Sequence, residues 1–193
     1  MSGHNGVRQY GMATARISAD HVKRYQFAAS MIGCGTVLDA ACGCGYGTKI
    51  LHDSGCKVIG IDISGGAIEF ARKHYPGPAY ICGRVDAGFI GEFDAVVSLE
   101  TLEHLADPLS LLGAARGRML IASVPNEVLY PFSAEHFADD EYPHQRHYTP
   151  EQFDSLLSEA GYTVMDRWCQ RDKKLCNMVP GVEGKFLIYV CHG

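Results

Sequence analysis

The chain has 193 residues, 47% of them hydrophobic and 20% charged, a composition typical of a globular protein. Its net charge of −5 gives no general attraction to nucleic acid or to an anionic membrane. No run reaches the ~18 consecutive apolar residues of a membrane span, and the polar N-terminus lacks the pattern of a signal peptide. The length favours a single domain over residues 1–193.

The eight cysteines include no C-x-x-C pair, and several lie in apolar runs, where a free thiol behaves as a small hydrophobe. We therefore expect reduced thiols and a cytoplasmic protein. Cys42 and Cys44 are separated by one residue, which is poor spacing for zinc.

From the N-terminus, residues 1–16 predict a loose arm, and apolar residues at helical spacing predict a helix over 18–31. Further strands are predicted at 36–41, 57–62, 79–82, 93–99, 118–124, 163–168 and 186–191, and further helices at 46–54, 65–74, 108–115 and 150–160. This alternation predicts an α/β fold with a Rossmann-like, seven-stranded, mostly parallel sheet, helices on both faces and an antiparallel edge strand.

The segment 125–149 is too long for an ordinary connection and is rich in aromatic residues, histidines and acids. Long irregular segments of this kind are commonly functional. We therefore expect it to form a lid or part of a substrate pocket, with residues 1–35 supplying an N-terminal arm and helix.

Two acids mark the ends of the first two predicted strands. One apolar run ends in Asp39 and a glycine-rich turn, and the next ends in Asp62, 23 residues later. Carboxyl ends of neighbouring parallel strands form nucleotide pockets, and an acid about 20 residues on can accept both ribose hydroxyls. An acid before the glycines disfavours a pyrophosphate but suits a ligand carrying an ammonium and a sulfonium. We therefore expect S-adenosylmethionine as the cofactor.

Several motifs resemble those of the class I methyltransferase family, in particular its small-molecule branch. They are Val37–Gly47, Ile59–Ser64, Val85–Ala87, Phe93–Pro108, Ser123–Asn126 and His147–Phe153. One departure is the short Ala115–Arg118 turn, where the family often has Pro-Gly-Gly. The resemblance implies that glycines hold the methionine part of the cofactor near one acid, that the second acid binds the ribose, and that a third binds the adenine edge. The implied cofactor-binding residues are Asp39, Gly43, Gly45, Asp62, Ile63, Asp86, Ala87 and Glu100.

Candidate catalytic groups follow the fourth strand at Glu100, Glu103 and His104. If a helix began at Glu100, all three would share one face. In one interpretation Glu103 and His104 are solvated or capping residues. In the other, the set binds a divalent metal such as Mg²⁺ or Mn²⁺, which would lower the pKa of a bound hydroxyl. Glu-x-x-Glu-His is similar to the metal ligands of ubiquinone-pathway O-methyltransferases and of small-RNA 2′-O-methyltransferases, and in the latter resemblance His144 is a further ligand.

His147 is a candidate general base, because an unperturbed imidazole has a pKa of ~6.5. Glu100 and His104 are the other catalytic candidates. Arg24 and Tyr25 on the first helix either close over the cofactor or are ordinary surface and core residues.

The sequence thus predicts an enzyme that transfers a methyl group from S-adenosylmethionine to a small molecule, most often at a hydroxyl. Two alternatives stay open: a metal-dependent RNA 2′-O-methyltransferase, and a cofactor-binding module without catalysis. The acidic net charge argues against a nucleic-acid partner.

Overall fold

The computed structural model describes residues 17–85, 93–114, 118–138, 140–171 and 177–193. These residues form one sheet of eight strands in the order β3-β2-β1-β4-β5-β8-β6-β7. The strands are β1 (Thr36–Ala40), β2 (Lys57–Asp62), β3 (Ala79–Cys82), β4 (Ala95–Leu99), β5 (Met119–Pro125), β6 (Thr163–Gln170), β7 (Met178–Pro180) and β8 (Phe186–His192). Strands β1 to β5 pair in parallel, whereas β8 is antiparallel to both β5 and β6, and β7 is antiparallel to β6.

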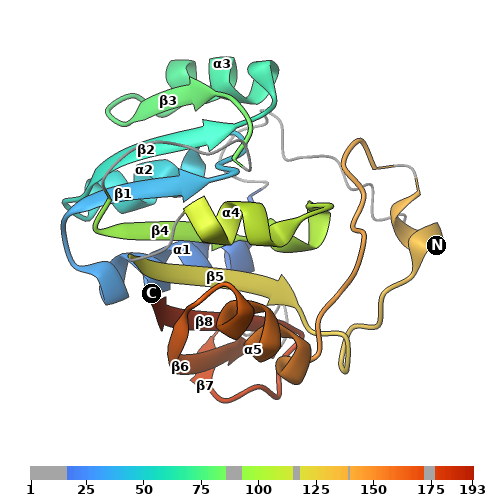
Figure 1. Ribbon diagram of the computed structural model, residues 1–193. Coiled ribbons are helices and arrows are strands. Elements are labelled where there is room, and N and C mark those ends of the chain that lie inside the picture. Colours follow the sequence, from blue (N-terminus) through green and yellow to red (C-terminus); the bar gives the residue numbers. More distant parts are fainter. Residues whose placement is uncertain (1–16, 86–92, 115–117, 139, 172–176) are drawn as a thin grey trace.

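Helices cover both faces of the sheet. They are α1 (Ala19–Ile32), α2 (Tyr46–Asp53), α3 (Gly65–His74), α4 (Pro108–Ala114) and α5 (Pro150–Glu159), with short 3₁₀ turns at η2 (Leu102–His104) and η3 (Ala134–Phe137). In Figure 1, α4 and α5 lie in front of the sheet, and α1 and α2 lie behind it.

The alternation of side chains along each strand divides the core into two layers. In β1, Leu38 packs in the layer that includes Leu112 of α4 and Phe153 of α5. Its neighbour Val37 packs in the other layer with Leu51 of α2. Each central strand is therefore apolar on both faces, as expected of a parallel sheet covered by helices.

The predicted strands and helices are confirmed, with bounds that differ by one or two residues. The sheet has one strand more than predicted, because the three-residue β7 adds to the edge beside Trp168–Gln170. The helix considered from Glu100 does not form. Glu100 has a left-handed φ of 53°, and only the 3₁₀ turn η2 follows it. The predicted arm over residues 1–16 lies outside the described residues.

The 125–149 segment begins at the end of β5 and extends past the carboxyl end of that strand (Figure 1). A parallel bridge between Asn126 and Tyr148 joins its two ends. Gln145 fastens its later part to η2, since its backbone N–H donates to the Glu103 carbonyl at 2.8 Å and its side-chain amide donates to the His104 carbonyl at 2.9 Å. The segment therefore lies over the residues that follow β4.

Within the described ranges, none of the helices has the length and apolar character that crossing a bilayer requires. The cysteines described there are free thiols.

Candidate active site

The glycine-rich turn after β1 has an irregular backbone that only small residues tolerate well. Ala41 has a φ of 63°, and Gly43 and Gly45 have φ values of 55° and 87°. A side chain at Gly45 would collide with Ala71 and Tyr80, so this glycine allows α2 and α3 to pack closely. Among the described residues, a side chain at Gly43 would meet nothing within 4 Å. Gly43 therefore presents bare backbone to open space, as a ligand cradle requires.

Asp39 is completely buried beneath this turn. Its carboxylate accepts a hydrogen bond from the Tyr25 hydroxyl at 3.0 Å and one from the Thr48 hydroxyl at 2.6 Å. Burial raises the pKa of Asp39 to about 7, although the two hydroxyl donors oppose that shift. In this structure Asp39 ties α1 and α2 to the end of β1.

Asp62 ends β2 and is almost fully buried. One carboxylate oxygen accepts from the Gly43 N–H at 2.9 Å and the other from the Ser64 N–H at 2.8 Å. The acid of the second strand is thus joined to the glycine turn of the first. Its neighbour Ile63 has 40% of its surface exposed beside it. The predicted adenine contacts, Asp86 and Ala87, lie outside the described residues.

Glu100 follows β4 directly and occupies a strained left-handed conformation. Its backbone N–H donates to the Ser123 carbonyl at 3.0 Å, and its carboxylate accepts from the Ser123 hydroxyl at 2.7 Å. Nη1 of Arg24 lies 3.5 Å from the same carboxylate oxygen.

Arg24 is 1% exposed and places its guanidinium 4.4 Å from the ring centroid of Phe186. Its two terminal nitrogens make no hydrogen bond with any described residue, although Asp20 and Glu100 lie 3.6 and 3.5 Å away. A buried cation with unused donors beside the ends of β1 and β4 is suited to an anionic group of a ligand. The sequence left open whether Arg24 closes over the cofactor or is an ordinary surface residue, and its burial excludes the surface position.

Glu103 is the most unusual acid in the described structure. It is fully buried in η2, and neither of its carboxylate oxygens has a hydrogen-bond partner. Burial, together with the nearby charge of Glu100, raises its pKa well above the ordinary value for a glutamate. An orphaned buried carboxylate costs stability, so its retention points to a ligand that pairs with it.

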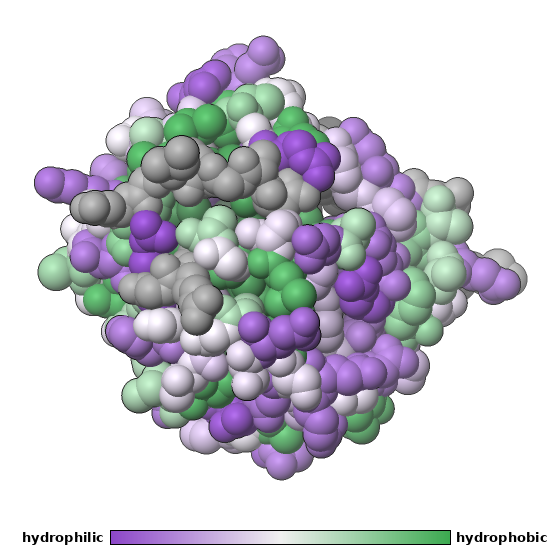
Figure 2. Space-filling model, in the orientation of Figure 1, coloured by the Kyte–Doolittle hydropathy of each residue, from purple (hydrophilic) through white to green (hydrophobic). Residues whose placement is uncertain are grey.

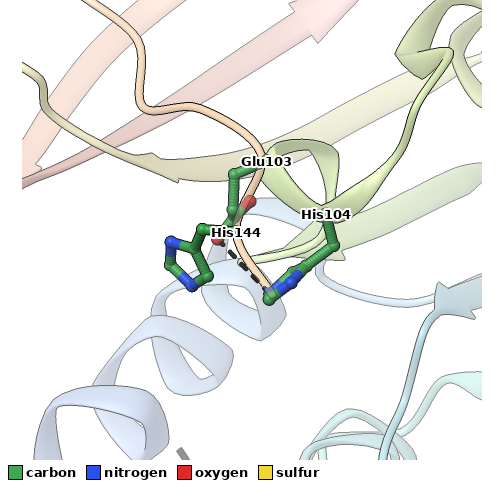
Figure 3. Close-up of side chains that lie close together, drawn as sticks. All are labelled: Glu103, His104 and His144. Carbon is green, nitrogen blue, oxygen red and sulfur yellow. Dashed lines mark ion pairs between the residues drawn. The ribbon is translucent and has the colours of Figure 1, made fainter. Parts of the chain in front are cut away.

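Two histidines lie beside Glu103, one from η2 and one from the 125–149 segment (Figure 3). Nε2 of His104 is 4.0 Å from Oε1 of Glu103. Glu103, His104 and His144 each offer a ligand atom, and these atoms lie within 4.8 Å of one another. Burial lowers the pKa of His144 to about 3, so its imidazole is neutral near pH 7. A carboxylate and two imidazoles form a donor set suited to Mn²⁺, Fe²⁺, Co²⁺ or Zn²⁺.

The structure brings three of the four predicted metal ligands together and separates the fourth. Glu100 is not in the group that could hold an ion among the described residues, because its carboxylate is turned toward Ser123 and Arg24. Glu100, Glu103 and His104 would share one face only if a helix began at Glu100. The left-handed backbone at Glu100 prevents that helix.

His147, the predicted general base, has both ring nitrogens in hydrogen bonds. Nδ1 lies 2.6 Å from the Tyr130 carbonyl, and Nε2 lies 2.9 Å from Nδ1 of His144. Burial lowers its pKa below the ordinary value for a histidine. These contacts favour an indirect role for His147, through His144.

Aromatic rings of the 125–149 segment surround the histidines. Phe137 of η3 stacks on His144 with ring centroids 4.0 Å apart, and Phe132 stacks on Phe137 at 6.0 Å. His104 meets His144 edge to face at 4.5 Å. The sequence indicated the aromatic content of the segment but not that Phe137 would cover His144.

The order of the strands, with parallel β3-β2-β1-β4-β5 and antiparallel strands beyond β5, is that of a Rossmann-like fold. Residues 38–120 match the family model described as a methyltransferase domain. The match confirms the resemblance seen in the motifs: these residues are similar to a methyltransferase domain, and the first relative below is named as S-adenosylmethionine-dependent.

Among curated proteins, a probable S-adenosylmethionine-dependent methyltransferase of Mycolicibacterium smegmatis is 29% identical over 144 residues, which cover 67% of this chain and 52% of the relative. A ubiquinone biosynthesis O-methyltransferase of Thiobacillus denitrificans is 38% identical over 89 residues, 40% of this chain and 37% of the relative. The matches thus span about half of the first relative and less of the second.

Among solved structures, a methyltransferase of Thermotoga maritima described as a possible histamine N-methyltransferase superposes with a TM-score of 0.71. It is 19% identical, and the match covers 90% of each chain. At 19% sequence identity this similarity supports the fold alone.

Proposed function

We propose that the chain binds S-adenosylmethionine at the carboxyl ends of β1 and β2 and transfers its methyl group to a hydroxyl of a small molecule. The observation that carries the proposal is the link between Gly43 and Asp62. The glycine turn offers open space over bare backbone, and the acid of the next strand is held at its edge by the Gly43 N–H. The names of the relatives support the same cofactor.

In this proposal each residue at the strand ends contacts a different part of the cofactor. Asp62 and Ile63 bind the ribose, Gly43 and Gly45 hold the methionine part, and Asp86 with Ala87 binds the adenine edge. Asp39 lies near the ammonium group. Arg24, whose guanidinium has unused donors near Glu100, pairs with the methionine carboxylate.

Methyl transfer is an in-line displacement. The acceptor oxygen forms a bond to the methyl carbon while the carbon–sulfur bond breaks, and the sulfonium becomes a neutral thioether. The hydroxyl proton must pass to a base, and most of the acceleration comes from holding the reactants in line. Glu100, His104 and His147 were the predicted catalytic residues, and the hydrogen bonds of His147 leave it an indirect role through His144. Of these, Glu100 lies at the end of β4 against Arg24 and Ser123.

We further propose that Glu103, His104 and His144 hold a divalent metal ion at the acceptor side of the site. The orphaned carboxylate of Glu103 and the two imidazoles beside it support this assignment. A bound ion would lower the pKa of the acceptor hydroxyl and position it. The 125–149 segment supplies His144 and the aromatic rings around it, which supports its predicted role as the substrate segment.

A crossed calorimetric titration tests both proposals. Wild type, Asp62→Asn and Glu103→Gln are each titrated with S-adenosylhomocysteine and with Mn²⁺. Asp62→Asn should weaken S-adenosylhomocysteine binding by about 10- to 100-fold, the effect of losing charge-assisted hydrogen bonds, and leave Mn²⁺ affinity unchanged. Glu103→Gln should reduce Mn²⁺ affinity by more than about 100-fold and leave the affinity for S-adenosylhomocysteine unchanged.

Each outcome bears on a separate part of the proposal. A wild-type chain that does not bind S-adenosylhomocysteine would contradict the cofactor assignment. Failure of the wild-type chain to bind Mn²⁺ would contradict only the metal site. Binding of the cofactor without methyl transfer to any of a panel of small hydroxyl compounds would favour the inactive module.

A further inference from the structure

His144 and His147 form a chain of hydrogen bonds that begins at a backbone carbonyl. A carbonyl oxygen only accepts, so the 2.6 Å contact between Nδ1 of His147 and the Tyr130 oxygen requires a proton on that Nδ1. In a neutral imidazole with a proton on Nδ1, Nε2 carries the lone pair. His147 therefore presents an acceptor to whatever faces its Nε2.

The group that faces it is Nδ1 of His144, at 2.9 Å. With His147 as acceptor, His144 must donate, and its own proton lies on Nδ1. Nε2 of His144 is then the nitrogen that carries the lone pair. His104 reaches the same state by a shorter route, because its Nδ1 lies 2.9 Å from the Tyr142 carbonyl. Both histidines beside Glu103 thus have their Nδ1 hydrogens directed to acceptors.

We propose that His147 is a positioning residue: held by the Tyr130 carbonyl, it fixes His144 as the Nδ1–H tautomer and so makes Nε2 of His144 the atom that binds a divalent cation beside Glu103 and His104. The inference rests on the metal site of the proposed function. Outer hydrogen bonds of this kind set the tautomer and orientation of ligating histidines, and their loss typically costs 10–100-fold in metal affinity.

Two substitutions at the same position separate hydrogen bonding from packing. The ring of His147 lies among Tyr130, Phe132 and Phe137, with centroids 4.9, 5.5 and 5.6 Å away. His147→Phe keeps an aromatic ring in this surrounding but removes the acceptor. His147→Gln places an amide oxygen near the position of Nε2 and keeps an acceptor for His144. Unchanged affinity for S-adenosylhomocysteine verifies that both variants are folded.

The first measurement is the tautomer of His144 in the metal-free protein, by long-range ¹H–¹⁵N correlation spectra of histidine-labelled chain, with signals assigned through single substitutions. We expect the Nδ1–H tautomer in wild type and in His147→Gln, and a mixture of tautomers or the Nε2–H form in His147→Phe. A wild-type His144 with its proton on Nε2, or a His147→Phe spectrum identical to wild type, would overturn the proposal.

The second measurement is Co²⁺ affinity, followed by the visible absorption of the bound ion. His147→Phe should bind about 10–100-fold more weakly than wild type, and His147→Gln within a few-fold of it. Equal affinity of His147→Phe and wild type would overturn the role of His147 while leaving the metal site in place. If no variant binds Co²⁺ but the tautomer changes as expected, the metal site fails and the fixing of the His144 tautomer stands.

Discussion

Asp39 in β1 and Glu103 in η2 are both fully buried acids, but their surroundings differ. Asp39 accepts hydrogen bonds from two hydroxyl groups, whereas the carboxylate of Glu103 has no hydrogen-bond partner. A buried carboxylate with donors can remain in a folded protein as a structural group. One without donors carries a large desolvation cost in its charged form, so its pKa rises, as it does at Glu103, unless a ligand compensates for the charge.

Stability should depend on pH through Asp39. The folded chain raises the pKa of this carboxyl to about 7, whereas an unfolded chain has a value of ~3.9. The folded state therefore binds the proton more tightly, and stability is lost as the pH rises from ~4 to ~7.

Urea unfolding of wild type and Asp39→Asn at pH 5, 6, 7 and 8 measures this effect. The difference in unfolding free energy, wild type minus variant, should fall by on the order of 1 kcal/mol per pH unit up to pH 7 and then level off. The fall should be smaller with saturating S-adenosylhomocysteine if the ligand ammonium lies beside Asp39. Parallel stability profiles for the two proteins would contradict the shifted pKa.

At the scale of elements, a glycine in α2 allows the N-terminal helix α1 to pack closely beside it. A side chain at Gly47 in α2 would overlap the ring of Tyr25 in α1, the same residue that donates to Asp39. Gly47 therefore lets α1 approach closely enough for the Tyr25–Asp39 hydrogen bond and for the ion pair between Arg24 and Glu100.

Gly47→Ala should destabilise the protein by about 1–3 kcal/mol, because overpacking outweighs the usual gain of up to ~1 kcal/mol from alanine in a helix. It should also weaken S-adenosylhomocysteine binding by displacing α1. The matched control is Gly66→Ala in α3, where a new side chain meets nothing within 4 Å and stability should be unchanged or higher. Thermal unfolding checks both, and equal melting temperatures for the two variants would refute the argument.

At the scale of the whole molecule, the net charge of −5 bears on the choice of acceptor. Figure 2 shows hydrophilic and hydrophobic residues mixed over the face it presents. Binding of nucleic acid depends mainly on neutralising phosphates with Lys and Arg, and this chain has 17 such residues against 22 acids. This balance favours a small acceptor over RNA.

We expect no saturable binding of a labelled short RNA below about 100 μM at 50 mM salt, since even non-specific binders reach 10⁻⁴ to 10⁻⁶ M under more demanding conditions. Fluorescence anisotropy at 50 and 200 mM salt measures it, with an established RNA-binding domain as the positive control. Affinity that falls steeply between the two salt concentrations would instead support the RNA 2′-O-methyltransferase alternative.

The elements of the sheet were predictable because their signals are local. Apolar runs such as Val37–Leu38 and Val96–Val97 indicate buried strands. A glycine-rich turn directly after a strand is typical of a nucleotide-binding site. The edge strand β7 was missed since three residues carry no periodicity. The backbone at Glu100 was missed because a left-handed φ in a glutamate has no sequence signature.

The sequence by itself predicted the fold class, the class of cofactor that we propose and the acids at the strand ends, because each prediction depends on residues close together along the chain. Only the tertiary structure decided which side chains meet beside Glu103. His104 and Tyr142 are 38 residues apart, and their hydrogen bond exists because Gln145 fastens the 125–149 segment to η2. Among the described residues the Glu103 carboxylate has no hydrogen-bond partner, and His144 and His147 are hydrogen-bonded to each other.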